Sequence, residues 1–332
     1  MRMLGSVLAL TLSSGALAAQ QPAYGPRLEG FDYPYPVQIY RVETQQQDLE
    51  MAYLDVAATN PPNGKTAVLM HGKNFCAATW ESTIGALANA GYRVIAPDQI
   101  GFCKSSKPEH YQFSLDQLAA NTRALLEHLG IEKSIVIGHS MGGMLATRYA
   151  LMYPQTTLHL GLVNPIGLED WRAAGVPWRS VDAWYQNDLK TSFERIRAYQ
   201  MDVYYAGTWK PEFARWARMQ AGMYAGQGME QVAWNQALTY DMIYSQPVVQ
   251  DFPYIKVPTT LFIGQKDRTA IGKDLAPADL KARLGDYPVL GQRAAAAIPG
   301  AQLVEFADLG HSPQVQDPER FNAALIKALS DR

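Results

Sequence analysis

Short apolar runs recur along the chain and alternate with segments that have helical periodicity. The runs are residues 67–70, 93–96, 134–137, 160–163, 260–263 and 303–306. Most of them lack polar alternation, which is typical of parallel strands that are covered by helices on both faces. Helices are expected between them at residues 83–90, 114–129, with Ser114 as the N-cap, and 318–329. The pattern therefore predicts an α/β sheet flanked by helices.

Two further segments near the N-terminus alternate with period two, Val37–Val42 and Glu50–Val56. This period predicts an antiparallel pair at a sheet edge, so that the predicted sheet has eight strands and is mostly parallel. Residues 19–36 are rich in proline, tyrosine and glycine and have no clear period, which predicts an extended arm. The core is assigned to residues 37–164 and 256–332.

Residues 165–255 interrupt the alternation of strands and helices. About ninety residues without a strand pattern are too long for an ordinary crossover between two strands. The segment is crowded with tryptophan, tyrosine and methionine at helical spacing, which predicts an inserted helical cap whose aromatic side chains mostly pack with one another. Such a cap is expected to enclose an apolar, water-poor pocket. Trp171 and Trp178 are the candidate substrate contacts from this segment.

The first eighteen residues have the pattern of an export signal. Arg2 supplies a positive charge, Val7–Leu12 is apolar, and Ala16–Ala18 offers a small-x-small cleavage site. An uncleaved anchor is the alternative, but the apolar stretch is shorter than the ~20 residues of a spanning helix. We expect a mature protein that begins at Ala19, lies in the periplasm or the medium and has no stable insertion in a membrane.

Charge and cysteine content limit which partners and which cysteine pairing are expected. The net charge of −2 and the absence of a basic stripe argue against a nucleic-acid partner and leave a small molecule as the expected one. Cys76 and Cys103 both follow predicted neighbouring strands, so they either pair in an oxidising compartment or remain two independent thiols. The sequence does not predict the oligomeric state.

The most informative motif is Gly138-His139-Ser140-Met141-Gly142, which follows an apolar run and precedes a helical segment. A strand that must stop while a helix starts within one residue forms a nucleophile elbow, and the glycines are needed where a Cβ would collide. Ser140 is expected to be presented rather than buried. The N–H of Met141, directly after it, is a candidate oxyanion donor.

A serine nucleophile needs a base and an acid that orients the base. His311 follows the last predicted strand, and Asp267 follows the one before it, where carboxylates gather at the crevice of a parallel sheet. Glu169 and Asp170 are the alternative acids. These positions predict a Ser140–His311–Asp267 triad.

The loop after the first parallel strand is expected to supply the second oxyanion donor. Gly72 allows close approach of the backbone, Lys73 N–H is the nominated donor, and Asn74 N–H is the alternative. The Lys73 side chain is expected to face solvent rather than act as a base. Phe75 and His139 are candidate substrate contacts, although His139 is expected to point away from Ser140 and to pack.

Four motifs together resemble the α/β-hydrolase superfamily, in the branch with a helical cap. They are His71-Gly72-x-x-Phe75 with Trp80, the loop Asp98–Ser106, the elbow at Ser140, and Gly310-His311 before Pro318-Glu319. The resemblance is to serine esterases, and in fold to epoxide hydrolases, haloalkane dehalogenases and carbon–carbon bond hydrolases. It covers residues 37–329 and implies the fold and the triad, but not the substrate.

Three features depart from that pattern. Cys103 replaces the usual second glycine of its loop, which again points to pairing with Cys76. Serine stands at the elbow, where epoxide hydrolases and haloalkane dehalogenases of this branch have aspartate. The segment Gly272–Tyr287 is longer than usual and is expected to form a lid edge or a partner surface.

These observations predict a secreted serine hydrolase that cleaves a carboxylic ester of a small to medium, partly apolar substrate through an acyl-enzyme, with no metal or organic cofactor. The alternatives are hydrolysis of another acyl bond (a carbon–carbon bond, an amide or N-terminal peptide, or a lactone) and a non-catalytic binding protein on the same fold. All three triad residues are present, which disfavours the binding protein.

Overall fold

A single eight-stranded sheet forms the centre of the molecule. The computed structural model describes residues 22–330, so the predicted export signal lies outside the described residues. The strands lie in the order β1-β2-β4-β3-β5-β6-β7-β8. β2 pairs antiparallel with β1 and β4, and the other neighbours are parallel, as predicted. The strands are β1 (Val37–Thr44), β2 (Gln47–Val56), β3 (Thr66–Met70), β4 (Arg93–Pro97), β5 (Ser134–His139), β6 (Thr157–Val163), β7 (Thr259–Gly264) and β8 (Gln302–Phe306).

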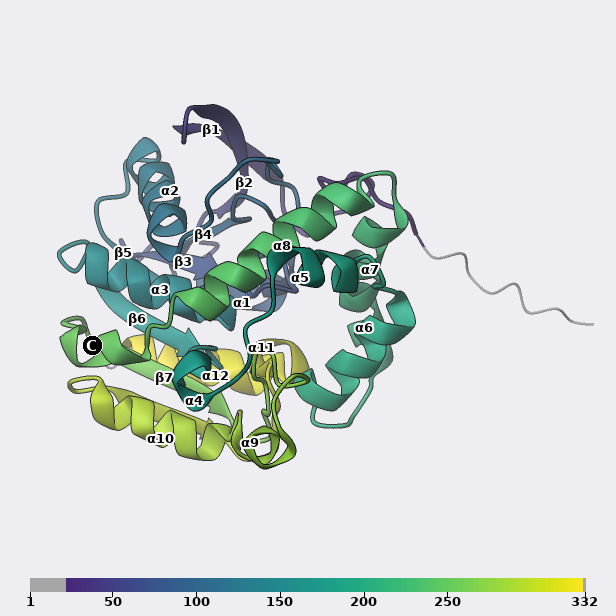
Figure 1. Cartoon of the computed structure of the whole chain (residues 1–332). Helices are drawn as coiled ribbons and strands as arrows, with labels where there is room; N and C mark the ends of the chain where they lie inside the picture. The colour runs from purple at the N-terminus through teal and green to yellow at the C-terminus, as the bar shows by residue number, and fades with distance from the viewer. Residues whose placement is uncertain (1–21, 331–332) are drawn as a thin grey trace, which may run out of the picture.

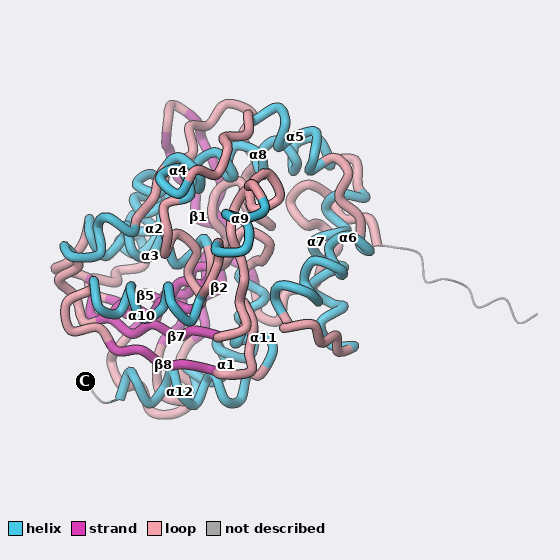
Figure 2. The backbone as a smooth tube through the Cα atoms, turned by 60° about the horizontal axis from the view of Figure 1, so that its bottom comes forward, coloured by secondary structure: helices cyan, strands magenta, loops and turns pink. Residues whose placement is uncertain are grey.

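Helices cover both faces of this sheet, as the unbroken apolar runs predicted (Figure 2). α1 (Glu81–Asn89) and α12 (Pro318–Ser330) pack on one face, in a cluster that includes Leu69. α2 (Leu115–His128), α3 (Met141–Met152) and α10 (Tyr287–Ala297) pack on the other, in a cluster that includes Val68. Ser114 caps α2 as predicted, because its Oγ accepts the Gln117 N–H at 3.0 Å. Shorter helices are η1 (Ala77–Trp80), α9 (Ala278–Arg283) and α11 (Pro313–Gln316).

The chain between β6 and β7 is helical wherever it is regular. We call residues 181–245 the cap. Its α5 packs on α8 and its α6 on α7, and Figure 1 shows α5, α6, α7 and α8 gathered beside one end of the sheet. No helix among the described residues is long and apolar enough to cross a bilayer. The helices of this interval are α4 (Trp171–Ala174), α5 (Val181–Asp188), α6 (Phe193–Tyr199), the π-helix η2 (Gln200–Tyr204), η3 (Pro211–Phe213), α7 (Ala214–Ala225), α8 (Met229–Ser245) and η4 (Val249–Tyr254).

Residues 22–36 form an arm without helix or strand that contacts both the cap and the core. The Tyr24 N–H donates to Gly222 O of α7 at 2.8 Å. Arg27 then forms an ion pair with Glu50 of β2 at 2.6 Å. Further along, the Tyr33 hydroxyl donates to Asp98 at 2.6 Å. The arm therefore connects the cap to β2 and to the loop after β4.

Candidate active site

Ser140 lies at a sharp turn between β5 and α3. Its backbone has φ 57° and ψ −120°, a conformation that L-residues rarely adopt. A Cβ on Gly138 would overlap the carbonyl oxygen of Gly142, and a Cβ on Gly142 would overlap that of Met70. The packing therefore requires glycine at both positions, as predicted. The strained backbone of this turn positions the serine.

Ser140 is less accessible than the elbow motif alone predicted. Its exposed fraction is 6 %, so it is buried rather than presented. The cap explains the difference, because η2 lies directly over the neighbouring histidine loop. A Cβ on Gly310 would come within 2.6 Å of Tyr204 O, and the Ser312 N–H donates to the same carbonyl at 3.4 Å. Substrate therefore has to reach the serine beneath the cap.

The structure brings His311 and Asp267 into direct contact. His311 Nδ1 lies 2.6 Å from Asp267 Oδ2, and both side chains are fully buried. His311 Nε2 is also buried, and among the described residues it has no hydrogen-bond partner. The imidazole is therefore held on one side by the carboxylate while its second nitrogen is left unused.

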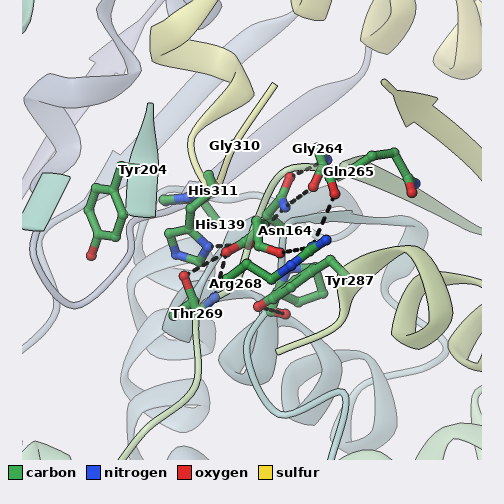
Figure 3. Close-up of polar contacts among 12 residues, drawn as sticks. His139, Asn164, Tyr204, Gly264, Gln265, Arg268, Thr269, Tyr287, Gly310 and His311 are labelled. Carbon is green, nitrogen blue, oxygen red and sulfur yellow. Dashed lines mark hydrogen bonds and ion pairs between the residues drawn. The ribbon is translucent and has the colours of Figure 1, made fainter. Parts of the chain in front are cut away.

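Two residues that the sequence analysis missed, Asn164 and Thr269, hold the Asp267 carboxylate, and Figure 3 shows both of them near His311. Asn164 Nδ2 donates to Oδ2 at 2.9 Å. Thr269 donates to Oδ1 through its backbone N–H at 2.8 Å and through its hydroxyl at 2.7 Å. With His311, four donors converge on one carboxylate and fix its orientation. The available signal for Asn164 was its position as the first polar residue after the apolar run of β6.

His139 has a different role from the predicted substrate contact. Its Nε2–H donates to the backbone carbonyl of His311 at 2.8 Å, and its exposed fraction is 1 %. Burial, with the nearby His311 and His71 imidazoles, holds the His139 pKa well below its usual range, so the ring is neutral near pH 7. His139 packs as expected and in addition fixes the main chain that carries His311.

The loop after β3 lies against the elbow. A Cβ on Gly72 would come within 3.0 Å of Ser140 Cβ, so only glycine lets the loop approach this closely. The Phe75 N–H donates to Gly72 O at 3.1 Å and closes a turn with Lys73 and Asn74 at its centre. The Lys73 and Asn74 N–H groups take no part in that turn bond, and Met141 is the first residue of α3, where helix N–H groups lack helical acceptors.

The Lys73 side chain does not face solvent, contrary to the sequence-based expectation. It is buried, and its Nζ donates to Gln236 Oε1 of α8 at 2.7 Å. The same nitrogen lies 3.5 Å from the centre of the Tyr240 ring. The cap is the physical reason, because α8 passes over this loop and takes the place of solvent.

Cys76 and Cys103 form a disulfide, which decides between the two possibilities that the sequence left open. Their Cα atoms are 5.9 Å apart, and both residues are buried. The bond joins the loop after β3 to the loop after β4. Cys103 has φ 46°, a left-handed conformation that explains why glycine is the usual residue at this position in the resembling family.

Polar and aromatic side chains cover the site on the side of the cap. Asn74 Nδ2 donates to the Tyr204 hydroxyl at 2.7 Å, and Gln220 Nε2 of α7 donates to Asn74 Oδ1 at 3.1 Å. The Tyr204 ring lies 4.8 Å from the His311 ring and 5.3 Å from that of Tyr199. Tyr204 therefore separates the imidazole from the space on the cap side.

That space is a cavity of about 340 Å³ between the loop after β3, the cap and residues 268–274. Its wall is more apolar than polar, as the aromatic content predicted, but charged side chains line it as well as rings. Ser140 and His311 do not line it directly. Gly272 and Lys273 do, so the start of the Gly272–Tyr287 segment forms part of the cavity wall. The lining residues are Lys73, Asn74, Arg179, Trp184, Asn187, Asp188, Thr191, Arg195, Ile196, Tyr199, Val203, Gln220, Tyr224, Tyr240, Arg268, Thr269, Ala270, Ile271, Gly272, Lys273 and Asp274.

The two tryptophans predicted as substrate contacts lie elsewhere. Trp171, the first residue of α4, is buried in the core, and its Nε1–H donates to Glu169 at 3.3 Å. Trp178 is 62 % exposed and bonds to Asp241. Tertiary packing, which aromatic spacing does not reveal, turns both away from the cavity. Phe75 borders only a small void beside the cavity and lies 5.6 Å from the Tyr204 ring.

The two alternative acids, Glu169 and Asp170, form hydrogen bonds with other groups. Glu169 accepts the Gly285 N–H at 3.0 Å, and burial raises its pKa above the usual range. Asp170 caps α4 by accepting the N–H groups of Arg172 and Ala173. Of the three candidate acids, only Asp267 contacts the histidine.

Comparison with known proteins agrees with this geometry. A probable hydrolytic enzyme of Pseudomonas aeruginosa PAO1, known from a crystal structure, is 66 % identical, with a TM-score of 0.93 over 94 % of this chain and 99 % of that one. A 2-hydroxy-6-oxononadienedioate/2-hydroxy-6-oxononatrienedioate hydrolase of Comamonas testosteroni is 26 % identical over 81 % of this chain and 88 % of its own length.

A third relative is longer than this chain. The dihydrolipoyllysine-residue acetyltransferase component of an acetoin cleaving system from Cupriavidus necator is 28 % identical over 80 % of this chain, which spans only 63 % of that protein. The profile of the alpha/beta hydrolase fold family matches residues 67–318, from β3 through the elbow to the start of α12. With the strand order and the elbow described above, this match makes the chain a member of the alpha/beta hydrolase family.

Proposed function

We propose that this protein is a serine hydrolase that works through an acyl-enzyme, with Ser140 as nucleophile, His311 as base and Asp267 as the orienting acid. One observation carries the proposal. A buried imidazole is bonded to a buried carboxylate at 2.6 Å, and within residues 22–330 its other nitrogen has no partner, at the sheet edge that also carries the elbow. A structural histidine would be expected to have both nitrogens satisfied.

In the proposed reaction, Ser140 Oγ attacks the carbonyl carbon of the substrate and passes its proton to His311 Nε2. Asp267 holds the Nδ1–H and stabilises the imidazolium that forms. The N–H groups of Met141 and Lys73 bind the oxyanion, with Asn74 as the alternative donor. His311 then returns the proton to the leaving group, and water releases the acyl group by the same steps in reverse order.

The bond we propose is a carboxylic ester of a small to medium substrate. A carbon–carbon bond next to a ketone is the second candidate, and the 26 % identity to a hydrolase of 2-hydroxy-6-oxo dienedioates favours it. Activity on vinylogous diketones that exceeds activity on esters would select this candidate. An aminopeptidase would need acidic groups placed for an amine, and the cavity lining contains more basic than acidic side chains.

We also propose that the protein is exported. The support is the signal pattern of residues 1–18 together with a buried disulfide, a bond that persists mainly in oxidising compartments. N-terminal sequencing of the mature protein tests this proposal. We expect Ala19 as the first residue in a periplasmic or extracellular fraction.

Labelling with a fluorophosphonate probe tests the nucleophile. We expect the wild type to be labelled and Ser140→Ala to remain unlabelled, while esters of rising acyl length show which substrate size is preferred. Absence of labelling on the folded wild type would overturn the serine hydrolase. Labelling that persisted in Ser140→Ala would place the nucleophile elsewhere.

A further inference from the structure

Lys73 places a cation deep at the wall of the cavity. Its side chain is buried, and its one hydrogen bond to the described residues goes to Gln236, a neutral amide. Its other close neighbour is the face of Tyr240, 3.5 Å away. Between them, these partners leave an N–H of the ammonium without a hydrogen-bond acceptor.

This buried ammonium has no ion-pair partner in the described part of the chain. The ion pairs found there, with a limit of 4.0 Å between nitrogen and oxygen, do not include Lys73. The Asp188 carboxylate, which lines the same cavity, favours the charged form of Lys73 from beyond that limit, and burial raises the Asp188 pKa. An unpaired buried charge costs several kcal/mol, and buried charges in proteins are normally paired. The missing partner is the basis of the inference.

Apart from Asp188, the remaining charges on the cavity wall are mostly basic. Arg179 is paired with Asp274, which neutralises one basic residue. Arg195, Arg268 and Lys273 remain, and their side chains bond to neutral groups, mainly backbone carbonyls. These three residues are the more exposed ones, so they surround the opening while Lys73 lies deeper. A concave wall of this kind attracts anions.

We propose that the cavity binds substrates whose acyl part ends in a carboxylate, and that the Lys73 ammonium is its ion partner. The inference deepens the proposed serine hydrolase and rests on it. Lys73 would then act at both ends of the substrate, because its backbone N–H is placed to bind the oxyanion while its side chain extends into the cavity. The substrate class is a half-ester of a short dicarboxylic acid.

The kinetic test compares two substrates that differ only in charge. Monomethyl glutarate carries the carboxylate, and methyl glutaramate has a neutral amide in its place. We expect kcat/KM of the wild type to favour the acid by about 10- to 100-fold, the range of one hydrogen bond to a charged group. In Lys73→Met this ratio falls to about one. The ratio within each variant cancels any loss that both substrates share.

Controls separate the specific role from a general loss of charge. Lys65→Met removes an exposed lysine outside the cavity lining and is expected to keep the wild-type ratio. Lys273→Met removes a rim charge and is expected to reduce the ratio by less than Lys73→Met does. Lys73→Gln, which keeps a hydrogen-bond donor, replaces Lys73→Met if the latter does not fold.

A binding experiment keeps the inference independent of catalysis. Calorimetry on Ser140→Ala measures the affinity for the same two compounds, and then for both in the Ser140→Ala, Lys73→Met double variant. Tighter binding of the acid that disappears in the double variant supports the inference. Equal affinities in Ser140→Ala would overturn it, even if fluorophosphonate labelling upholds the serine hydrolase. If labelling fails while the acid still binds more tightly, the proposed function falls and the carboxylate site stands.

Discussion

Removing the Cys76–Cys103 disulfide gives the most direct test of how the two loops are held. The cysteines are 27 residues apart in the sequence. Loop-closure entropy for that separation amounts to about 3.5 kcal/mol at 25 °C. Both sulfurs are buried, so truncation also leaves a small void. We therefore expect Cys76→Ala, Cys103→Ala to lower the free energy of unfolding by about 3.5 kcal/mol or somewhat more.

A matched variant isolates the backbone contribution. Cys103 has φ 46°, and a left-handed conformation costs a non-glycine residue about 1–2 kcal/mol. Cys76→Ala, Cys103→Gly should therefore be more stable than the double alanine variant by about 1 kcal/mol. Urea unfolding followed by fluorescence measures all three proteins under the same conditions. A loss below about 1 kcal/mol in the double alanine variant would refute the loop-entropy reasoning, and identical stability of the two double variants would refute the strain.

Three further predictions concern the titrating and orienting groups. Asp267→Asn should slow fluorophosphonate labelling by about 10⁴-fold through the wrong histidine tautomer, and an unchanged rate would contradict the orienting role. Burial lowers the Lys73 pKa to about 8, although Asp188 opposes this shift; Tyr240 contacts the ammonium, and Tyr224 and Arg195 line the same cavity. The acid-to-amide preference should therefore be constant between about pH 6 and 7, where the substrate carboxyl is ionised, and fall as the pH rises through 8; a flat profile to pH 9.5 would exclude the ammonium. Burial also lowers the Lys107 pKa from 10.5 to about 7, so the unfolded chain binds more protons between these values. The free energy of unfolding of the wild type should hence rise relative to Lys107→Met from pH 7 to 10, as measured by urea unfolding at several pH values.

The sheet and its helices were predictable because a short unbroken apolar run is typical of a parallel strand that is covered by helices on both faces. The elbow was predictable for a similar reason, since Gly138 and Gly142 are required by contacts that any side chain would break. His311 and Asp267 could be chosen by their position after consecutive strands. The residues that follow each strand were therefore enough to predict which side chains lie at the carboxyl edge of the sheet.

The cap was less predictable, because its side chains take their roles from tertiary contacts. Trp171 and Trp178 have the spacing of cavity residues, yet one packs in the core and the other faces solvent. Lys73 was expected in solvent because nothing local indicates that α8 crosses above it. Asn164 and Thr269 act through Asp267, and that relation becomes visible only when β6 and β7 are paired.

The arm of residues 22–36 has a practical consequence for protein engineering. Tyr24 is bonded to α7 and Arg27 to β2, so a truncated gene product that starts at Val37 would lose both attachments at once. Such a truncation would keep every strand of the sheet while allowing the cap to shift over its opening. A recombinant design that preserves Tyr24 and carries its affinity tag after α12 leaves these attachments intact.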